Sequence, residues 1–217
     1  MIAPQPFDQQ EIPMIVALPV KPQFSLGPLI LAIICIAFFF AGQSMTDVLA
    51  YDRYALQSME TWRLISGNLA HTNGYHLLLN LVGLALLWAL HGEHYRPVTF
   101  LKLFIWCGLG TSLGIYFLSP HLIWYVGLSG ALHGIFVWGA FMDILNKVRS
   151  GWLLLAGVAA KLVFEQLQGS SEDVASLIDA SVAVDAHLYG AVCGVLLFVL
   201  MWGSSLAAGF IASRRKA

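Results

Sequence analysis

Six long apolar segments recur along the chain and are separated by shorter polar stretches. Each has close to the roughly 20 residues that an α-helix needs to cross the hydrocarbon core of a bilayer. We expect helices at about 26–42, 74–90, 99–118, 129–146, 151–168 and 181–204. Six crossings put both ends of the chain on the same side. The pattern therefore predicts an all-α membrane protein built as a six-transmembrane-helix bundle.

The composition supports a membrane protein and excludes several other classes. Of the 217 residues, 59% are hydrophobic and only 11% are charged, a balance that a soluble domain could not keep in solution. The basic residues are scattered between apolar runs and form no basic face, so nucleic acid is not expected as a partner. The three cysteines lie in apolar segments without metal spacing. The lipid bilayer is thus the first expected partner.

Both ends of the chain differ from the bundle. Residues 1–24 hold five of the eight prolines together with several charges, which predicts a flexible tail. Residues 25–206 form the expected six-helix domain, and residues 207–217 form a basic C-terminal tail. Because most basic loop residues fall on the side of the two ends, we expect both termini in the cytoplasm. We expect a multi-pass protein of the bacterial inner (plasma) membrane.

Three of the predicted helices carry polar residues near their outer ends. Ser129 opens the fourth helix within Gly127-Leu-Ser-Gly130. His76 and Asn80 lie at the start of the second helix, and His187 lies at the start of the sixth. Ionisable groups are costly at such depths and usually mark functional sites. The shared depth predicts that these side chains meet.

These residue types together suit acyl transfer. A serine hydroxyl becomes a useful nucleophile when a neighbouring base takes its proton, and His187 is the candidate base for Ser129. A short serine can reach across two helices only where small residues let the helices approach. Gly130 and Gly134 recur at four-residue spacing on the fourth helix, and Ala186, Gly190 and Gly194 do so on the sixth.

The same chemistry needs donors for a negatively charged oxygen. His76 and Asn80 are four residues apart, so they lie on one helical face, and both can donate a hydrogen bond. The backbone N–H of Ser129, at a helix start where amides lack internal partners, is a third candidate donor. These three groups are the predicted oxyanion hole.

Taken together, these motifs resemble the rhomboid family of intramembrane serine proteases over nearly all six helices. The resemblance is carried by the residues and motifs Trp62-Arg63, His71-x4-His76-x3-Asn80, Gly127-Leu-Ser-Gly130 and Ala186-His187-x2-Gly190-x3-Gly194. It implies that Ser129 is the nucleophile and His187 the base, a dyad without a third acid. It also implies that His76, Asn80 and the Ser129 amide form the oxyanion hole, and that Trp62-Arg63 fixes a membrane-embedded loop.

Several neighbouring polar residues receive other interpretations. Many rhomboids have a tyrosine where this chain has His133, and the imidazole could either stack on His187 or hydrogen-bond to it. Asp185 lies two residues before His187 and so faces elsewhere, which argues against a role as a triad acid. Lys161 and Glu165 are four residues apart on the fifth helix, and we interpret them as a pair that neutralises charge in the membrane.

The run from Gly127 to Gly134 and the absence of a large extra domain look most like the rhombosortase branch. That similarity implies membrane-anchored protein substrates with a C-terminal Gly-Gly sorting tail, which consists of a glycine-rich motif, one membrane helix and a basic end. The expected enzyme is a serine endopeptidase that acts near the outer, periplasmic face. No metal and no cofactor are expected, and the sequence does not indicate an oligomeric state.

Four alternatives remain open. The protein could be a general rhomboid protease of single-pass membrane proteins, or a non-catalytic rhomboid-like protein that binds membrane helices; intact Ser129 and His187 argue against the latter. A proton-relaying transporter would need polar residues across the whole bilayer, whereas here they stop at the outer end. A metal site could be built from His71, His76, His133 and His187, but the lack of a nearby carboxylate or thiolate ligand makes it the least favoured of the four.

Overall fold

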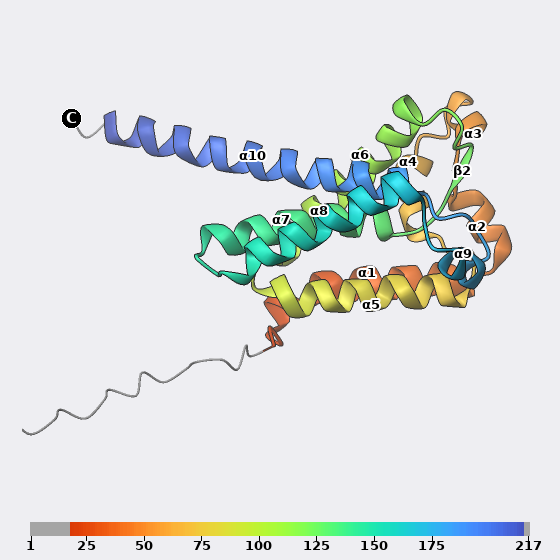
Figure 1. Cartoon of the computed structure of the whole chain (residues 1–217), viewed down its shortest axis with the longest axis horizontal. Helices are drawn as coiled ribbons and strands as arrows, with labels where there is room; N and C mark the ends of the chain where they lie inside the picture. The colour runs from red at the N-terminus through yellow and green to blue at the C-terminus, as the bar shows by residue number, and fades with distance from the viewer. Residues whose placement is uncertain (1–17, 215–217) are drawn as a thin grey trace, which may run out of the picture.

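The computed structural model describes residues 18–214 and contains six long helices. The six long helices of the described chain are α1 (Pro22–Phe40), α5 (Gly74–His91), α6 (Pro97–Leu118), α7 (Ser129–Leu145), α8 (Ser150–Gln168) and α10 (Val184–Arg214). Figure 1 shows that the long helices run roughly alongside one another, with α7 drawn between α10 above and α5 below. The predicted all-α membrane bundle is therefore confirmed.

Five of the long helices are apolar and long enough to cross a membrane. The exception within the described residues is α7, which has 17 residues and is apolar but shorter. At 1.5 Å per residue it is about 26 Å long, less than the roughly 30 Å of hydrocarbon. Its residues are mostly buried among the other helices, so α7 faces protein and has no need to match the bilayer.

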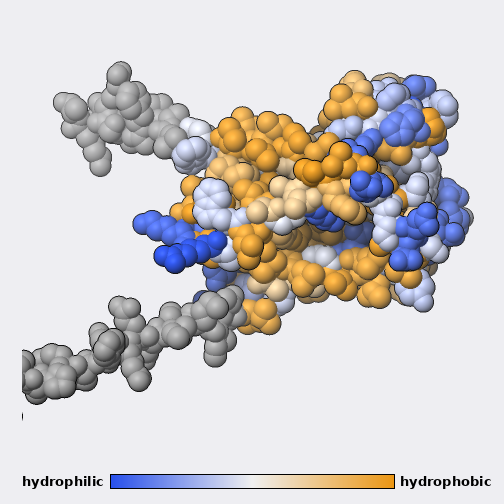
Figure 2. Space-filling model, viewed as in Figure 1, coloured by the Kyte–Doolittle hydropathy of each residue, from blue (hydrophilic) through white to orange (hydrophobic). Residues whose placement is uncertain are grey.

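Large apolar side chains remain exposed on the outside of the bundle. Phe40, Leu153 and Leu167 are 80%, 75% and 74% exposed. Figure 2 shows hydrophobic surface over the middle of the molecule and hydrophilic residues toward both ends. A surface of this kind is stable in lipid and would aggregate in water.

The short elements all lie between long helices, and most gather at one end (Figure 1). The start of α1 and the end of α10 lie at the opposite end, as an even number of crossings requires. The short elements are α2 (Gln43–Leu49), β1 (Tyr51–Asp52), α3 (Arg53–Gln57), α4 (Arg63–Ser66), η1 (Gly67–Leu69), η2 (Gly92–His94), β2 (Trp124–Tyr125) and α9 (Glu172–Ile178).

Two predicted boundaries need correction. The first helix begins at Pro22, inside the predicted tail, because proline is tolerated at the first helical position. The last helix continues past residue 204 to Arg214, because no proline follows the apolar run. Residues 1–17 of the predicted N-terminal tail and 215–217 of the C-terminal tail lie outside the described residues.

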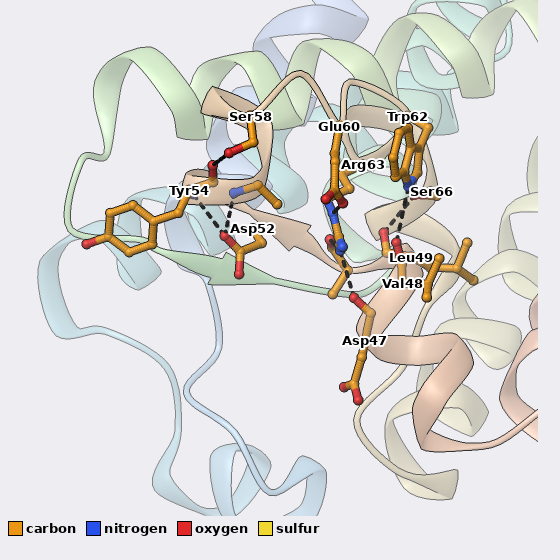
Figure 3. A network of polar contacts seen from close by, with 12 residues as sticks. Asp47, Val48, Leu49, Asp52, Tyr54, Ser58, Glu60, Trp62, Arg63 and Ser66 are labelled. Carbon is orange, nitrogen blue, oxygen red and sulfur yellow. Dashed lines mark hydrogen bonds and ion pairs between the residues drawn. The ribbon is translucent and has the colours of Figure 1, made fainter.

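The long loop between α1 and α5 is tied together by Trp62 and Arg63 (Figure 3). Arg63 donates through Nη1 to the carbonyls of Asp47 and Ala50, each at 2.7 Å. Its Nε lies 2.7 Å from Glu60 Oε2. The indole N–H of Trp62 donates to the Val48 carbonyl at 3.2 Å. These bonds satisfy backbone carbonyls that have no helical partner, so this pair shapes the loop.

A second arginine joins this loop to the next one. Arg53 donates to the carbonyls of Ile115, Tyr116 and Ser119 at 2.9 to 3.0 Å. Those carbonyls belong to the end of α6, where orphan acceptors and the helix dipole both favour a cation. The adjacent strands β1 and β2 pair antiparallel, with Tyr51 opposite Tyr125. The chain that leads into Ser129 is thereby fixed to the first loop.

Candidate active site

Ser129 is the first residue of α7, and a tight turn delivers it. Gly127 just before it has φ +121°, a conformation that glycine adopts without strain. The Gly127 amide donates to the Gly67 carbonyl at 3.0 Å, and the Tyr125 hydroxyl donates to the Gly127 carbonyl at 2.7 Å. Burial raises the pKa of the Tyr125 phenol, so it stays protonated and remains a donor. The nucleophile candidate is therefore held on a braced turn.

The Ser129 hydroxyl points at the imidazole of His187. The distance from Ser129 Oγ to His187 Nε2 is 3.0 Å, within hydrogen-bond reach. His187 comes from the first turn of α10 and is 5% exposed. The structure thus brings together two residues that are 58 positions apart in the sequence.

Glycines bring α7 and α10 close enough for this contact. A Cβ atom built on Gly190 would collide with the Gly130 carbonyl, and one on Gly194 would collide with the Gly134 carbonyl. The two helix backbones therefore touch directly along this seam. Without such an approach, a side chain as short as serine could not reach an imidazole on the neighbouring helix.

The other ring nitrogen of His187 contacts a carboxylate. His187 Nδ1 lies 2.9 Å from Glu165 Oε2, and Lys161 Nζ lies 2.7 Å from Glu165 Oε1. The family resemblance implied a dyad without a third acid, whereas the structure places the Glu165 carboxylate against His187. The predicted pair of Lys161 and Glu165 does form, through Glu165 Oε1. The other carboxylate oxygen of Glu165, Oε2, contacts His187. Asp185 instead accepts from Ser119 Oγ at 2.5 Å, away from the site, as its spacing indicated.

His133 stacks on the candidate base. The centroids of the His133 and His187 rings are 4.2 Å apart, with an angle of 19° between their planes. His133 Nδ1 lies 2.7 Å from the Ser129 carbonyl, one turn earlier on α7. Of the two arrangements that the sequence left open, the structure shows stacking. The His133 ring therefore covers one face of the His187 imidazole, and the two ring nitrogens remain open to partners at the edge.

His76 and Asn80 face the serine from α5. A Cβ atom added to Gly127 would lie 2.6 Å from His76 Nε2 and 3.8 Å from Asn80 Nδ2, so both side chains border the turn before Ser129. Asn80 donates one hydrogen to the His76 carbonyl at 3.2 Å, and its amide carries a second hydrogen. Both residues are buried.

Thr72 contacts the far nitrogen of the His76 ring. His76 Nδ1 lies 3.4 Å from the Thr72 amide and 3.0 Å from Thr72 Oγ1. The Thr72 hydroxyl donates to the Ile178 carbonyl at 2.5 Å, so it cannot also donate to the ring. With the proton on Nε2, the Thr72 amide is the donor to Nδ1, and Nε2 can donate toward the serine.

His71 lies behind His76 and does not reach the serine. Its ring is 2% exposed and packs edge-on against His76, with centroids 5.1 Å apart. Burial, aided by the nearby His76, lowers the pKa of His71 to about 3. The ring is therefore neutral at physiological pH, and its contact with His76 is one of packing.

A cavity of about 810 Å³ opens beside the catalytic candidates. Ser129, His187, His76 and Asn80 lie at its polar end, and apolar side chains of α5 and α8 line the rest. These apolar lining residues include Leu79, Leu86, Leu90, Leu153, Leu154 and Phe164. The cavity lies between two helices that face lipid, a setting that suits an apolar polypeptide segment.

A second, smaller cavity of about 90 Å³ borders the same serine. Its walls come from Ser129, His76, Thr72 and the β2 region, and from residues after α9. The helix α9 is tied to the start of α5, because Thr72 Oγ1 and Asn73 Nδ2 donate to the carbonyls of Ile178 and Leu177. Ser129 therefore lines both a large apolar cavity and a small, more polar one.

Comparisons with known proteins identify this arrangement. The "Rhomboid domain" family model matches residues 58–204, which is more than half of the chain. The chain belongs to the rhomboid family. It is also 29% identical over 141 residues to the Bacillus subtilis (strain 168) protein named "Putative rhomboid protease YdcA", covering 65% of this chain and 67% of that protein. The family assignment supports an intramembrane protease, integral to the membrane with several crossings.

In this rhomboid, some of the predicted site residues line the cavity and others lie around it. Ser129, His187, His133, His76 and Asn80 meet at the cavity. The supporting glycines lie on the turn before Ser129 and along the seam of α7 and α10. Trp62 and Arg63 shape the loop between α1 and α5 and do not line the cavity, while His71 packs behind the site.

Sequence reasoning missed Glu165 and Thr72 as neighbours of the site. The spacing of Lys161 and Glu165 did signal a charged pair in a membrane helix, but not the side of the bundle on which it lies. Thr72 left no signal, because a lone threonine before a helix is common. Within the described residues, His133, Glu165 and His187 also offer ligand atoms within 4.8 Å of one another, a set different from the four histidines weighed above.

Proposed function

We propose that this rhomboid is a serine endopeptidase of the rhombosortase type, which cleaves membrane-anchored proteins near the outer face of the membrane. The observation that carries the proposal is the 3.0 Å contact between Ser129 Oγ and His187 Nε2 at the edge of an apolar cavity. The loop charges support the predicted orientation, with both termini in the cytoplasm of a bacterial inner membrane.

The reaction begins with proton transfer to His187. Nε2 accepts the Ser129 proton while Oγ attacks the scissile carbonyl, and the imidazolium then donates that proton to the leaving amine. A water molecule later repeats the attack on the acyl-enzyme, with His187 again as base. The small outer cavity, which borders Ser129, gives water a route that does not cross the apolar cavity.

The developing oxyanion needs donors that are already in place. The candidates are His76 Nε2, the free amide hydrogen of Asn80 and the backbone N–H of Ser129. The Ser129 N–H belongs to the first position of a helix, where no partner exists within the helix. All three groups border the same turn, and we assign them the oxyanion role.

Two features support a Gly-Gly-tailed substrate. The sequence from Gly127 to Gly134 resembles the rhombosortase branch. The cavity on the outer side of Ser129 is only about 90 Å³, so large side chains next to the scissile bond would not fit there. The membrane helix of such a substrate would lie in the apolar cavity between α5 and α8.

The test uses two membrane-anchored reporters that differ at one motif. Each carries a secreted domain, one membrane helix and a basic end, and the Gly-Gly pair is replaced by Leu-Leu in the second reporter. We expect the parent protein to release only the Gly-Gly reporter and the Ser129→Ala variant to release neither.

The other outcomes separate the alternatives. Equal release of both reporters by the parent, with none by Ser129→Ala, would indicate a general rhomboid protease. Capture of both reporters without release by the parent would indicate a helix-binding protein and contradict the protease proposal. Release by Ser129→Ala at the parent rate would contradict it as well.

A further inference from the structure

Glu165 is placed to act on His187 from the side opposite Ser129. Its Oε2 atom lies 2.9 Å from His187 Nδ1, and His187 Nε2 lies 3.0 Å from Ser129 Oγ. The three side chains come from three different helices, α8, α10 and α7. They form one continuous chain of hydrogen bonds from a carboxylate through an imidazole to a hydroxyl.

We propose that Glu165 is a positioning residue that completes a Ser129–His187–Glu165 triad, with Lys161 holding the carboxylate in place. This inference rests on the proposed function of Ser129 and His187. It replaces the two-residue mechanism that the family resemblance implied.

The hydrogen-bond pattern shows what Glu165 contributes. A carboxylate can only accept, so its contact with Nδ1 requires the proton on that nitrogen. Nε2 is then left with its lone pair toward Ser129, which is the form that a general base needs. When Nε2 takes the serine proton, Nδ1 keeps its own, and the imidazolium is stabilised by the ionised Glu165, which does not itself accept a proton.

Lys161 makes this geometry more rigid. Its ammonium contacts Oε1, and His187 contacts Oε2, so the two carboxylate oxygens have separate partners. The Glu165 side chain is 12% exposed, and that of Lys161 is 46% exposed. A buried carboxylate without a partner would be costly. The Glu165 carboxylate has two partners, the buried His187 imidazole and the more exposed Lys161 ammonium.

The competing account is that Glu165 serves only to neutralise Lys161. The two accounts differ in a double variant. If neutralisation were the whole role, Lys161→Met combined with Glu165→Gln would remove both charges and keep activity. If Glu165 positions His187, the double variant stays as slow as Glu165→Gln alone.

The experiment measures cleavage of the Gly-Gly reporter by the purified full chain in liposomes. For Glu165→Gln we expect kcat to fall about 100-fold, at the low end of what general-base catalysis contributes, with KM unchanged. The matched control is Glu172→Gln, which removes an exposed carboxylate on α9 and should leave both constants unchanged. Thermal unfolding of each variant reports any loss of fold.

The outcomes are distinct from those that test the proposed function. An active parent with Glu165→Gln or the double variant at the parent kcat would overturn the triad, and Ser129 and His187 would stand. A parent that neither cleaves nor reacts at Ser129 would overturn the proposed function itself. Treatment with EDTA should have no effect; activity lost with EDTA and restored by zinc would make Glu165 a metal ligand beside His133 and overturn the positioning role.

Discussion

The His187→Ala variant is expected to cleave substrate about 10²–10⁴-fold more slowly than the parent, the range that a general base contributes. The His187 imidazole is a base within reach of the Ser129 hydroxyl, at 3.0 Å from Oγ to Nε2. Without it, Oγ keeps its proton and attacks a carbonyl poorly. The measurement is the initial rate of reporter cleavage by purified protein in liposomes, at equal amounts of folded enzyme.

The control for this variant is His121→Ala. His121 lies in the connection between α6 and β2, and its side chain is 70% exposed. Its removal also deletes one imidazole from the chain that leads into β2, but His121 lines neither cavity. We expect the parent rate for His121→Ala. A His187→Ala rate within the error of the His121→Ala rate would refute the role of His187 as base.

The Gly190→Ala variant is expected to lose both stability and activity. Its added methyl would meet the Gly130 backbone and would lie 3.0 Å from Thr111 Oγ1, so α10 must move away from α7. Overpacking of this kind costs about 1–3 kcal/mol, and a displacement of about 1 Å at reacting atoms can cost about 10²-fold in rate. The measurements are thermal unfolding in detergent and the cleavage rate.

Gly203→Ala is the matched control on the same helix. In the described part of the chain, nothing lies within 4 Å of a Cβ atom at Gly203, so the substitution should leave the rate at the parent value and should not lower the stability. Equal behaviour of the two variants would show that the close seam between α7 and α10 is not needed for the site.

Much of this architecture follows from the sequence for a simple reason. A segment that crosses lipid must satisfy its backbone internally and present apolar side chains, so each crossing leaves a long hydrophobic run. Polar residues within such runs are rare and stand out, which is why Ser129, His76, Asn80 and His187 could be grouped before their contacts were known. The glycine spacing on α7 and α10 indicated the close approach that the structure shows.

The contacts that the sequence did not predict depend on how the helices pack against one another. Residue spacing within one helix does not define that packing. The Lys161–Glu165 pair was visible in the sequence, but its contact with His187 depends on how α8 is rotated and where it packs. The stacking of His133 depends on the short distance between α7 and α10. The short length of α7 is explained by its burial among the surrounding helices, which only the packed structure shows.

The placement of α8 links two properties of the site. Residues of α8 line one wall of the apolar cavity, and the same helix carries Glu165 to His187. Only three of the 19 residues of α8 are buried, so this helix packs less fully than α7. The proposed triad is therefore completed by the helix that also borders the proposed substrate path.

The most direct test of the account is the covalent modification of purified protein in liposomes by a fluorophosphonate probe, followed by peptide mass spectrometry. Such a probe reacts with a serine whose proton is taken by a neighbouring base. We predict an adduct on Ser129 in the parent and none in His187→Ala. No adduct in the parent, an adduct on Ser170 or Ser171 of the cavity lining in its place, or equal labelling of Ser129 in both proteins would contradict the account.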